Sequence, residues 1–259
     1  MLNVKLVTSL VTCSLLTACA SQPTKAPSPT ANTKLVLILV GGNSESLNSG
    51  GIWKLYEGRE KARDGHLISS IQKYTGLASD QIATYYYSWT GDDEDQRNSF
   101  LPGHWNWIFG GAAPIKKSLE SVLATRSNNM QLAIVGWSNG GATAYELACT
   151  LEAQQQLNLL VTLDPVAWTT KPCPYYSAGK LDTPSNWIDV YTESGLTSRL
   201  NAGNIIALVG RAWDSDKLPS TPVSIHKLAP ANHGDTKDMW DKKVTHNEVF
   251  YNWASSLKP

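Results

Sequence analysis

The most informative stretch of the sequence is Leu132-Ala133-Ile134-Val135-Gly136-Trp137-Ser138-Asn139-Gly140-Gly141. Its first four residues form an apolar run, which predicts a strand buried on both faces. A G-x-S-x-G pattern follows at once, and a helix is expected over residues 141–155. A serine on a sharp turn from a buried strand into a helix projects from the carboxyl edge of the sheet, where the helix dipole favours negative charge. The stretch therefore predicts that Ser138 is a nucleophile; the alternative is a serine in an ordinary strand-to-helix turn.

Apolar runs and amphipathic stretches alternate on both sides of this turn. Strands are expected at residues 34–40, 82–89, 132–135, 159–163, 187–191, 205–209 and 222–228. Helices are expected at residues 57–75, 114–123 and 141–155 and from Lys237 onward. One stripe of the last helix is marked by Trp240, Val244, Tyr251 and Ala254. The alternation predicts an α/β fold in which helices cover both faces of a mostly parallel central sheet.

The serine turn and its surroundings resemble the α/β-hydrolase superfamily, and the likeness extends over nearly all of residues 34–259. In that superfamily the first strand ends in a loop that helps to bind an oxyanion. Here the loop is Gly41-Gly42-Asn43, without the histidine often found there. The resemblance implies an α/β-hydrolase fold, with oxyanion contacts from the N–H of Asn139 and from that of Gly42 or Asn43. It also implies an acyl-enzyme mechanism acting on esters.

A nucleophilic serine needs a neutral imidazole within hydrogen-bond reach, and five histidines compete for this role. His233 follows the last expected strand and precedes the closing helix, where the superfamily places its base. His104 precedes the serine, against the superfamily's chain order of Ser, acid, His. His66, His226 and His246 lie within expected helices or strands, as structural or solvated histidines do. We therefore expect His233 to be the general base.

Two carboxylates fit the third position, which orients the imidazole. Asp164 directly follows a buried strand, where an unpaired charge is costly, so a histidine partner is favoured over a loop-capping role. Glu193 lies at the carboxyl end of the next strand, the more usual position in the superfamily. Asp189 and Asp214 are lesser candidates. We expect Asp164 to orient the histidine and keep Glu193 as the alternative acid.

Aromatic residues in a long loop before the serine are candidates for a substrate cleft. Trp105, Trp107 and Phe109 alternate there, and with Trp137 they could line an acyl-binding cleft or form a lid; the alternative for the loop is a local hydrophobic plug. No His, Cys or Asp cluster has the spacing of a metal site, and the acidic run at residues 92–95 lacks the spacing of a calcium loop. We therefore expect no metal and no other cofactor.

The N-terminus predicts export. Lys5 and the apolar residues 6–16 have the pattern of a signal peptide and are too short to span a bilayer. Leu16-Thr17-Ala18-Cys19 resembles the lipobox of bacterial lipoproteins, which implies cleavage after residue 18 and a lipid on Cys19. Ala20 replaces the aspartate that retains lipoproteins in the inner membrane, which favours the periplasmic face of the outer membrane in a cell that has one. The alternative is an ordinary signal peptide in which Cys19 is incidental.

Composition separates the remainder of the chain into a tether and one domain. Residues 19–33 hold three prolines and almost no large apolar side chain, which predicts a flexible tether. Residues 34–259 are expected to form one α/β-hydrolase domain. Cys149 and Cys173 are the cysteines left in this domain and are expected to form a disulfide. The full chain has 22 basic and 22 acidic residues, so it lacks the positive charge that nucleic-acid binding needs.

Three functions are consistent with these residues. The first is hydrolysis of small-molecule or lipid carboxylic esters, with the membrane as partner through the lipid anchor. The second is thioesterase or acyltransferase chemistry using the same serine, histidine and acid. The third is a non-catalytic envelope lipoprotein of this fold that binds a ligand or partner. Nucleophile, base and acid candidates in the superfamily's order favour catalysis over binding.

Overall fold

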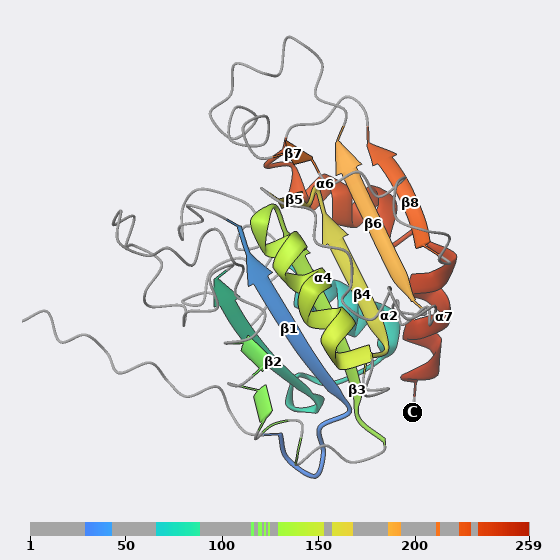
Figure 1. Cartoon of the computed structure of the whole chain (residues 1–259). Coiled ribbons are helices and arrows are strands. Elements are labelled where there is room, and N and C mark those ends of the chain that lie inside the picture. Colours follow the sequence, from blue (N-terminus) through green and yellow to red (C-terminus); the bar gives the residue numbers. More distant parts are fainter. Residues whose placement is uncertain are drawn as a thin grey trace, which may run out of the picture.

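A parallel sheet forms the centre of the molecule (Figure 1). The computed structural model describes residues 29–42, 66–88, 115–116, 119–120, 122, 124, 129–152, 157–167, 186–192, 211–212, 223–228 and 233–258. Within these ranges six strands pair in parallel in the order β2-β1-β3-β4-β6-β8. Their bounds are β1 Leu35–Gly41, β2 Ile82–Ser88, β3 Gln131–Trp137, β4 Leu159–Leu163, β6 Trp187–Thr192 and β8 Val223–Leu228. The parallel α/β architecture expected from the sequence is confirmed.

Strand β1 shows why its sequence is a continuous apolar run. All seven of its residues are buried. Leu35, Leu37 and Leu39 belong to one hydrophobic cluster, whereas Val36, Ile38 and Val40 belong to the cluster on the opposite face. Side chains alternate across a strand, so a strand covered on both faces needs an apolar residue at every position.

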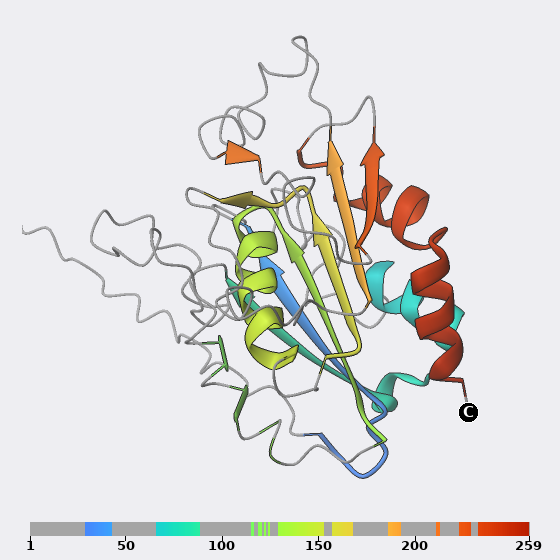
Figure 2. The ribbon, with the colours of Figure 1, turned by 45° about the vertical axis from the view of Figure 1, so that its right-hand side comes forward.

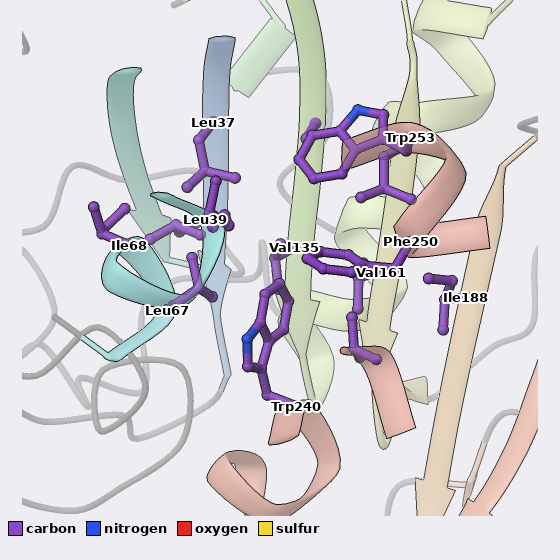
Figure 3. Close-up of a cluster of buried hydrophobic side chains, with 14 of the residues drawn as sticks. Leu37, Leu39, Leu67, Ile68, Val135, Val161, Ile188, Trp240, Phe250 and Trp253 are labelled. Atoms are coloured by element: carbon purple, nitrogen blue, oxygen red, sulfur yellow. The ribbon is translucent and has the colours of Figure 1, made fainter. Parts of the chain in front are cut away.

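Helices cover both faces of the sheet, as expected (Figure 2). Helix α4 (Asn139–Glu152) contributes to one cluster, and helices α2 (His66–Thr75) and α7 (Glu248–Ser256) contribute to the other. Figure 3 shows Trp240 and Phe250 packed beside Val135 and Val161 of the central strands. Short elements complete the order: η2 Ser79–Gln81, β5 Val166–Ala167, β7 Arg211–Ala212, α6 Thr236–Met239 and the π-helical turn η8 Trp240–Val244. Strands β5 and β7 form a separate antiparallel pair.

The prediction of one closing helix from Lys237 onward is wrong in detail. A turn separates η8 from α7, and it contains His246, which the sequence placed within a helix. The Asn247 side chain accepts a hydrogen bond of 2.7 Å from the Val249 N–H and caps a new helix. The interruption shifts the buried face, so Tyr251 is 42% exposed whereas Phe250 is buried.

Other expected elements are described in part. The strand expected at residues 205–209 and residues 57–65 of the first expected helix lie outside the described residues. Cys149 is fully buried in α4 and is disulfide-bonded. Its expected partner, Cys173, lies outside the described residues, so that pairing stays a prediction. None of the described helices has the length and apolar character needed to cross a membrane.

A charged cluster connects α2 with the segment that precedes α7. Asp241 in η8 lies 2.5 Å from Nε2 of His66 and 2.6 Å from Nζ of Lys237. Partial burial opposes ionisation of Asp241, but hydrogen bonds with Lys237 and His66 outweigh it and hold the pKa of this carboxyl below its usual value. The cluster therefore fixes the start of α2 against the chain that follows residue 233.

Candidate active site

Ser138 lies on a strained turn between β3 and α4. Its φ is 57°, in the left-handed region that costs energy for any residue with a side chain. The surrounding backbone holds the turn: the Ser138 N–H donates to the Leu163 carbonyl (3.0 Å), and the Ser138 carbonyl accepts from the N–H groups of Gly141 (2.9 Å) and Val166 (3.0 Å). These bonds fix the turn against the end of β4.

Glycines allow α4 to begin directly after the serine. A Cβ on Gly140 would lie 2.3 Å from the carbonyl oxygen of Val40 and 2.4 Å from that of Gly41. A Cβ on Gly136 would lie 2.5 Å from the carbonyl oxygen of Gly140. No side chain fits at either position, because the first turn of α4 packs against the backbone of β1 and β3. The helix starts at Asn139, two residues earlier than the sequence predicts.

Three buried side chains from distant parts of the chain meet at the carboxyl edge of the sheet. The Nε2 atom of His233 lies 2.8 Å from Oγ of Ser138, and its Nδ1 atom lies 2.6 Å from Oδ2 of Asp164. The exposed fractions are 2% for Ser138, 3% for His233 and 7% for Asp164. Both distances are within hydrogen-bond range. The structure therefore brings together the serine, histidine and aspartate named from the sequence.

Asp164 lies in a bulge at the end of β4. The chain bonds Ser138 at both Leu163 and Val166, so Asp164 and Pro165 bulge between these two contacts, while the Asp164 N–H still donates to the Val190 carbonyl of β6 at 2.6 Å. Asp164 has a φ of 43°, which aspartate tolerates better than most residues. Pro165 has no N–H to satisfy, so its place in this loop leaves no backbone donor unpaired. The loop aims the carboxylate at His233 rather than along the sheet.

Thr192 is a site residue that the sequence analysis missed. Its backbone N–H donates to Oδ1 of Asp164, and its hydroxyl donates to Oδ2, each at 2.9 Å. The available signal was its place as the last residue of β6, beside the end of β4. Parallel strands end at one edge of a sheet, so residues that follow neighbouring strands meet there. Thr192 therefore holds both carboxylate oxygens, and its hydroxyl shares Oδ2 with His233 Nδ1.

The other candidate acids and bases that the structure describes lie elsewhere. Asp189 is buried within β6, where its Oδ1 accepts a bond of 2.6 Å from the Thr162 hydroxyl. His226 lies within β8, and His66 pairs with Asp241. His104, Glu193 and Asp214 lie outside the described residues.

Backbone positions suited to an oxyanion flank Ser138. Gly42 follows β1, and a Cβ there would lie 2.8 Å from the Cβ of Ser138, so only glycine lets this loop approach the serine. Asn139 is the first residue of α4, and the first N–H groups of a helix have no intrahelical acceptor. Asn43 lies outside the described residues. Strand β1 lies between β2 and β3, so the strand order reverses here, as at the ligand sites of open α/β sheets.

The proposed cleft residues are described only in part. Trp105, Trp107 and Phe109 lie outside the described residues. Trp137 is 8% exposed, and its indole N–H donates to the carbonyl of His233 at 2.8 Å. Within the described ranges, no three His, Cys, Asp or Glu side chains are grouped so that they could hold a metal ion.

The strand order and the strained serine turn give the chain an α/β-hydrolase fold.

The sequence matches no protein-family model and no curated protein sequence. Among solved structures, it is similar to dienelactone hydrolase from Anabaena variabilis, with 14% identity, 87% of each chain covered and a TM-score of 0.48. A serine hydrolase from Xanthomonas campestris has 12% identity, covers 88% of this chain and 86% of its own, and has a TM-score of 0.46. Carboxyl esterase 2 from Tuber melanosporum has 12% identity and a TM-score of 0.46, and the alignment covers 89% of this chain and 78% of the esterase.

Proposed function

We propose that the chain is a serine hydrolase that cleaves carboxylic esters through an acyl-enzyme intermediate. The observation that carries the proposal is the continuous hydrogen-bonded chain from Ser138 through His233 to Asp164, with distances of 2.8 and 2.6 Å. Its members have the geometry that an activated serine needs: a nucleophile bonded to a base, and a base oriented by a third group.

Each residue has a defined part in the proposed reaction. Ser138 Oγ attacks the ester carbonyl while Nε2 of His233 takes its proton, and His233 then returns that proton to the leaving alcohol. Asp164 accepts a hydrogen bond from Nδ1–H, which fixes the tautomer and stabilises the imidazolium. The N–H of Asn139, with that of Gly42 or Asn43, donates to the oxyanion. Water attacks the acyl-enzyme in the second half, and His233 serves as base again.

Burial of the three side chains supports catalysis over ligand binding. Burying a carboxylate and an imidazole away from water costs free energy unless each group has hydrogen-bond partners. Here both ring nitrogens of the imidazole and both oxygens of the carboxylate have hydrogen-bond partners. A non-catalytic protein of this fold would gain little from keeping a strained serine with φ of 57° beside this pair.

Labelling with a fluorophosphonate probe tests the proposal directly. We expect the folded wild-type chain to be labelled on Ser138, and a matched Ser138→Ala variant to remain unlabelled. A panel of p-nitrophenyl esters of graded acyl length, with matching thioesters, then identifies the preferred bond and chain length. A folded wild-type chain that neither reacts with the probe nor turns over any acyl substrate would indicate the non-catalytic alternative. A preference for thioesters or for transfer to an alcohol would indicate thioesterase or acyltransferase chemistry.

Thr192 supplies a second test of the same site. Thr192→Val keeps the shape and the backbone N–H bond to Asp164 but removes the hydroxyl bond to Oδ2. We expect kcat to fall about tenfold with KM unchanged, because the carboxylate loses one of the donors that hold it. Thr192→Ser retains the hydroxyl and is expected to keep most of the activity. Wild-type turnover in Thr192→Val would show that Asp164 is held without this hydroxyl.

We also propose that the protein is exported and held on a membrane by a lipid on Cys19. The support is the signal-like segment, the lipobox resemblance and the proline-rich tether, all in residues 1–33. Expression of the full chain in a bacterium is expected to give membrane-bound protein whose N-terminal peptide carries lipid on Cys19. The Cys19→Ser variant should lose the lipid. A soluble, unlipidated wild-type protein that begins at another residue would contradict the anchor.

A further inference from the structure

We propose that Trp137 is a positioning residue that holds the general base, His233, rather than a residue of the substrate cleft. This inference rests on the proposed function, because it assigns Trp137 a part in the same reaction. Two contacts carry it: a hydrogen bond from the indole N–H to the backbone of His233, and a contact between the two rings.

The hydrogen bond anchors the turn that carries the histidine. The indole Nε1–H of Trp137 donates to the His233 carbonyl at 2.8 Å, and this bond is buried. Trp137 is the last residue of β3, a strand paired with β1 on one side and β4 on the other, so the donor is fixed by the sheet. The residue after His233 is less confined, since a Cβ on Gly234 would meet nothing within 4 Å. The bond therefore joins the backbone that carries His233 to the central sheet.

The ring contact acts on the imidazole. The ring centroids of Trp137 and His233 lie 5.0 Å apart, with an angle of 33° between the planes. When His233 takes the proton of Ser138 it becomes an imidazolium, and the face of a tryptophan attracts a cation. The contact therefore favours the charged state formed during the reaction, together with the carboxylate of Asp164 on Nδ1.

The position of the indole leaves little of it for substrate. A Cβ on Gly42 would lie 2.7 Å from Cε3 and 2.8 Å from Cζ3 of the indole, so the backbone after β1 packs closely against its six-membered ring. The N–H on the five-membered ring is used by His233. The side chain lies between Gly42 and His233, and only 8% of the residue is exposed. It fixes the distance between these two parts of the site.

The sharpest test replaces Trp137 with benzothienylalanine, which has the same ring shape with sulfur in place of the N–H. We expect kcat to fall about tenfold and fluorophosphonate labelling to slow by the same factor, with KM within about twofold of wild type, because one neutral hydrogen bond is lost. Trp137→Leu also removes the ring contact and should lower kcat further. Benzothienylalanine at Trp240 is the matched control: it removes another indole N–H bond, the part-buried one to Ser70 at 3.1 Å, and should leave kcat unchanged.

The outcomes separate this inference from the proposed function. A changed KM or acyl-length preference with wild-type kcat would assign Trp137 to the cleft and overturn the inference, as would wild-type kcat and KM together. Failure of the wild type to react would overturn the proposed function. In that case the low-field NMR signal of the His233 Nδ1 proton still tests the role of Trp137. Loss of this signal in the benzothienylalanine variant would support the positioning role, and retention of the signal would contradict that role.

Discussion

Ser138→Ala is expected to lower ester turnover by about 10⁶-fold, the scale of loss when the nucleophile of a serine hydrolase is removed. Without Oγ there is no group for His233 to deprotonate, and no acyl-enzyme forms. Binding of the ester and the backbone oxyanion contacts should persist, so KM is expected to change much less than kcat. The measurement is steady-state turnover of the best ester from the panel, with circular dichroism to confirm the fold.

The strained backbone of Ser138 calls for a second variant. Alanine at a φ of 57° keeps the strain, whereas glycine adopts this conformation without cost. Ser138→Gly should therefore be as inactive as Ser138→Ala without being destabilised by a side-chain clash. Ser255→Ala, at an exposed position of α7, is the control and should retain full activity. Near-native turnover in a folded Ser138 variant would place the nucleophile elsewhere.

The sequence predicts those features that depend on local pattern. Strand β1 is recognisable because both of its faces are buried, which requires the unbroken apolar run ending at Val40. The serine turn is recognisable because close packing of α4 on β1 and β3 admits only glycine at positions 136 and 140. His233 could be chosen from five histidines because it follows the last expected strand, where the superfamily resemblance places the base. For the strand and the serine turn, the signal lies within a few residues.

Features that depend on contacts between distant residues could not be predicted in the same way. Thr192 and Asp164 are 28 positions apart, and only the pairing of β4 with β6 brings them together. The left-handed φ of Asp164 occurs in the bulge between Leu163 and Val166, and that bulge is defined by hydrogen bonds to the distant Ser138. The hydrogen bond of Trp137 was equally hidden, because nothing local shows that its indole donates to a residue 96 positions away.

The choice of acid is the part of the site that the sequence left most open. In the sequence, Asp164 and Glu193 each follow an expected strand of the same parallel sheet, so both carboxyl groups are expected at one edge of that sheet. In the structure it is Asp164 Oδ2 that lies 2.6 Å from Nδ1 of His233, and Thr192 holds the same carboxylate with two donors. This arrangement leads to a prediction in which the two acids behave differently.

Asp164→Asn is expected to lower kcat by about 10⁴-fold, because an amide can hold the wrong tautomer of the histidine and cannot stabilise the imidazolium. Asparagine suits the φ of 43° as well as aspartate does, and its side-chain oxygen can still accept the Thr192 N–H, so the fold should be unchanged. Glu193→Gln is the matched substitution and should alter kcat less than about threefold, because the imidazole keeps its Asp164 partner. Measured kcat values for both purified variants, with equal thermal stability as the control, decide between the acids. A large loss in Glu193→Gln together with a small one in Asp164→Asn would reverse the assignment of the acid while leaving Ser138 and His233 in their proposed roles.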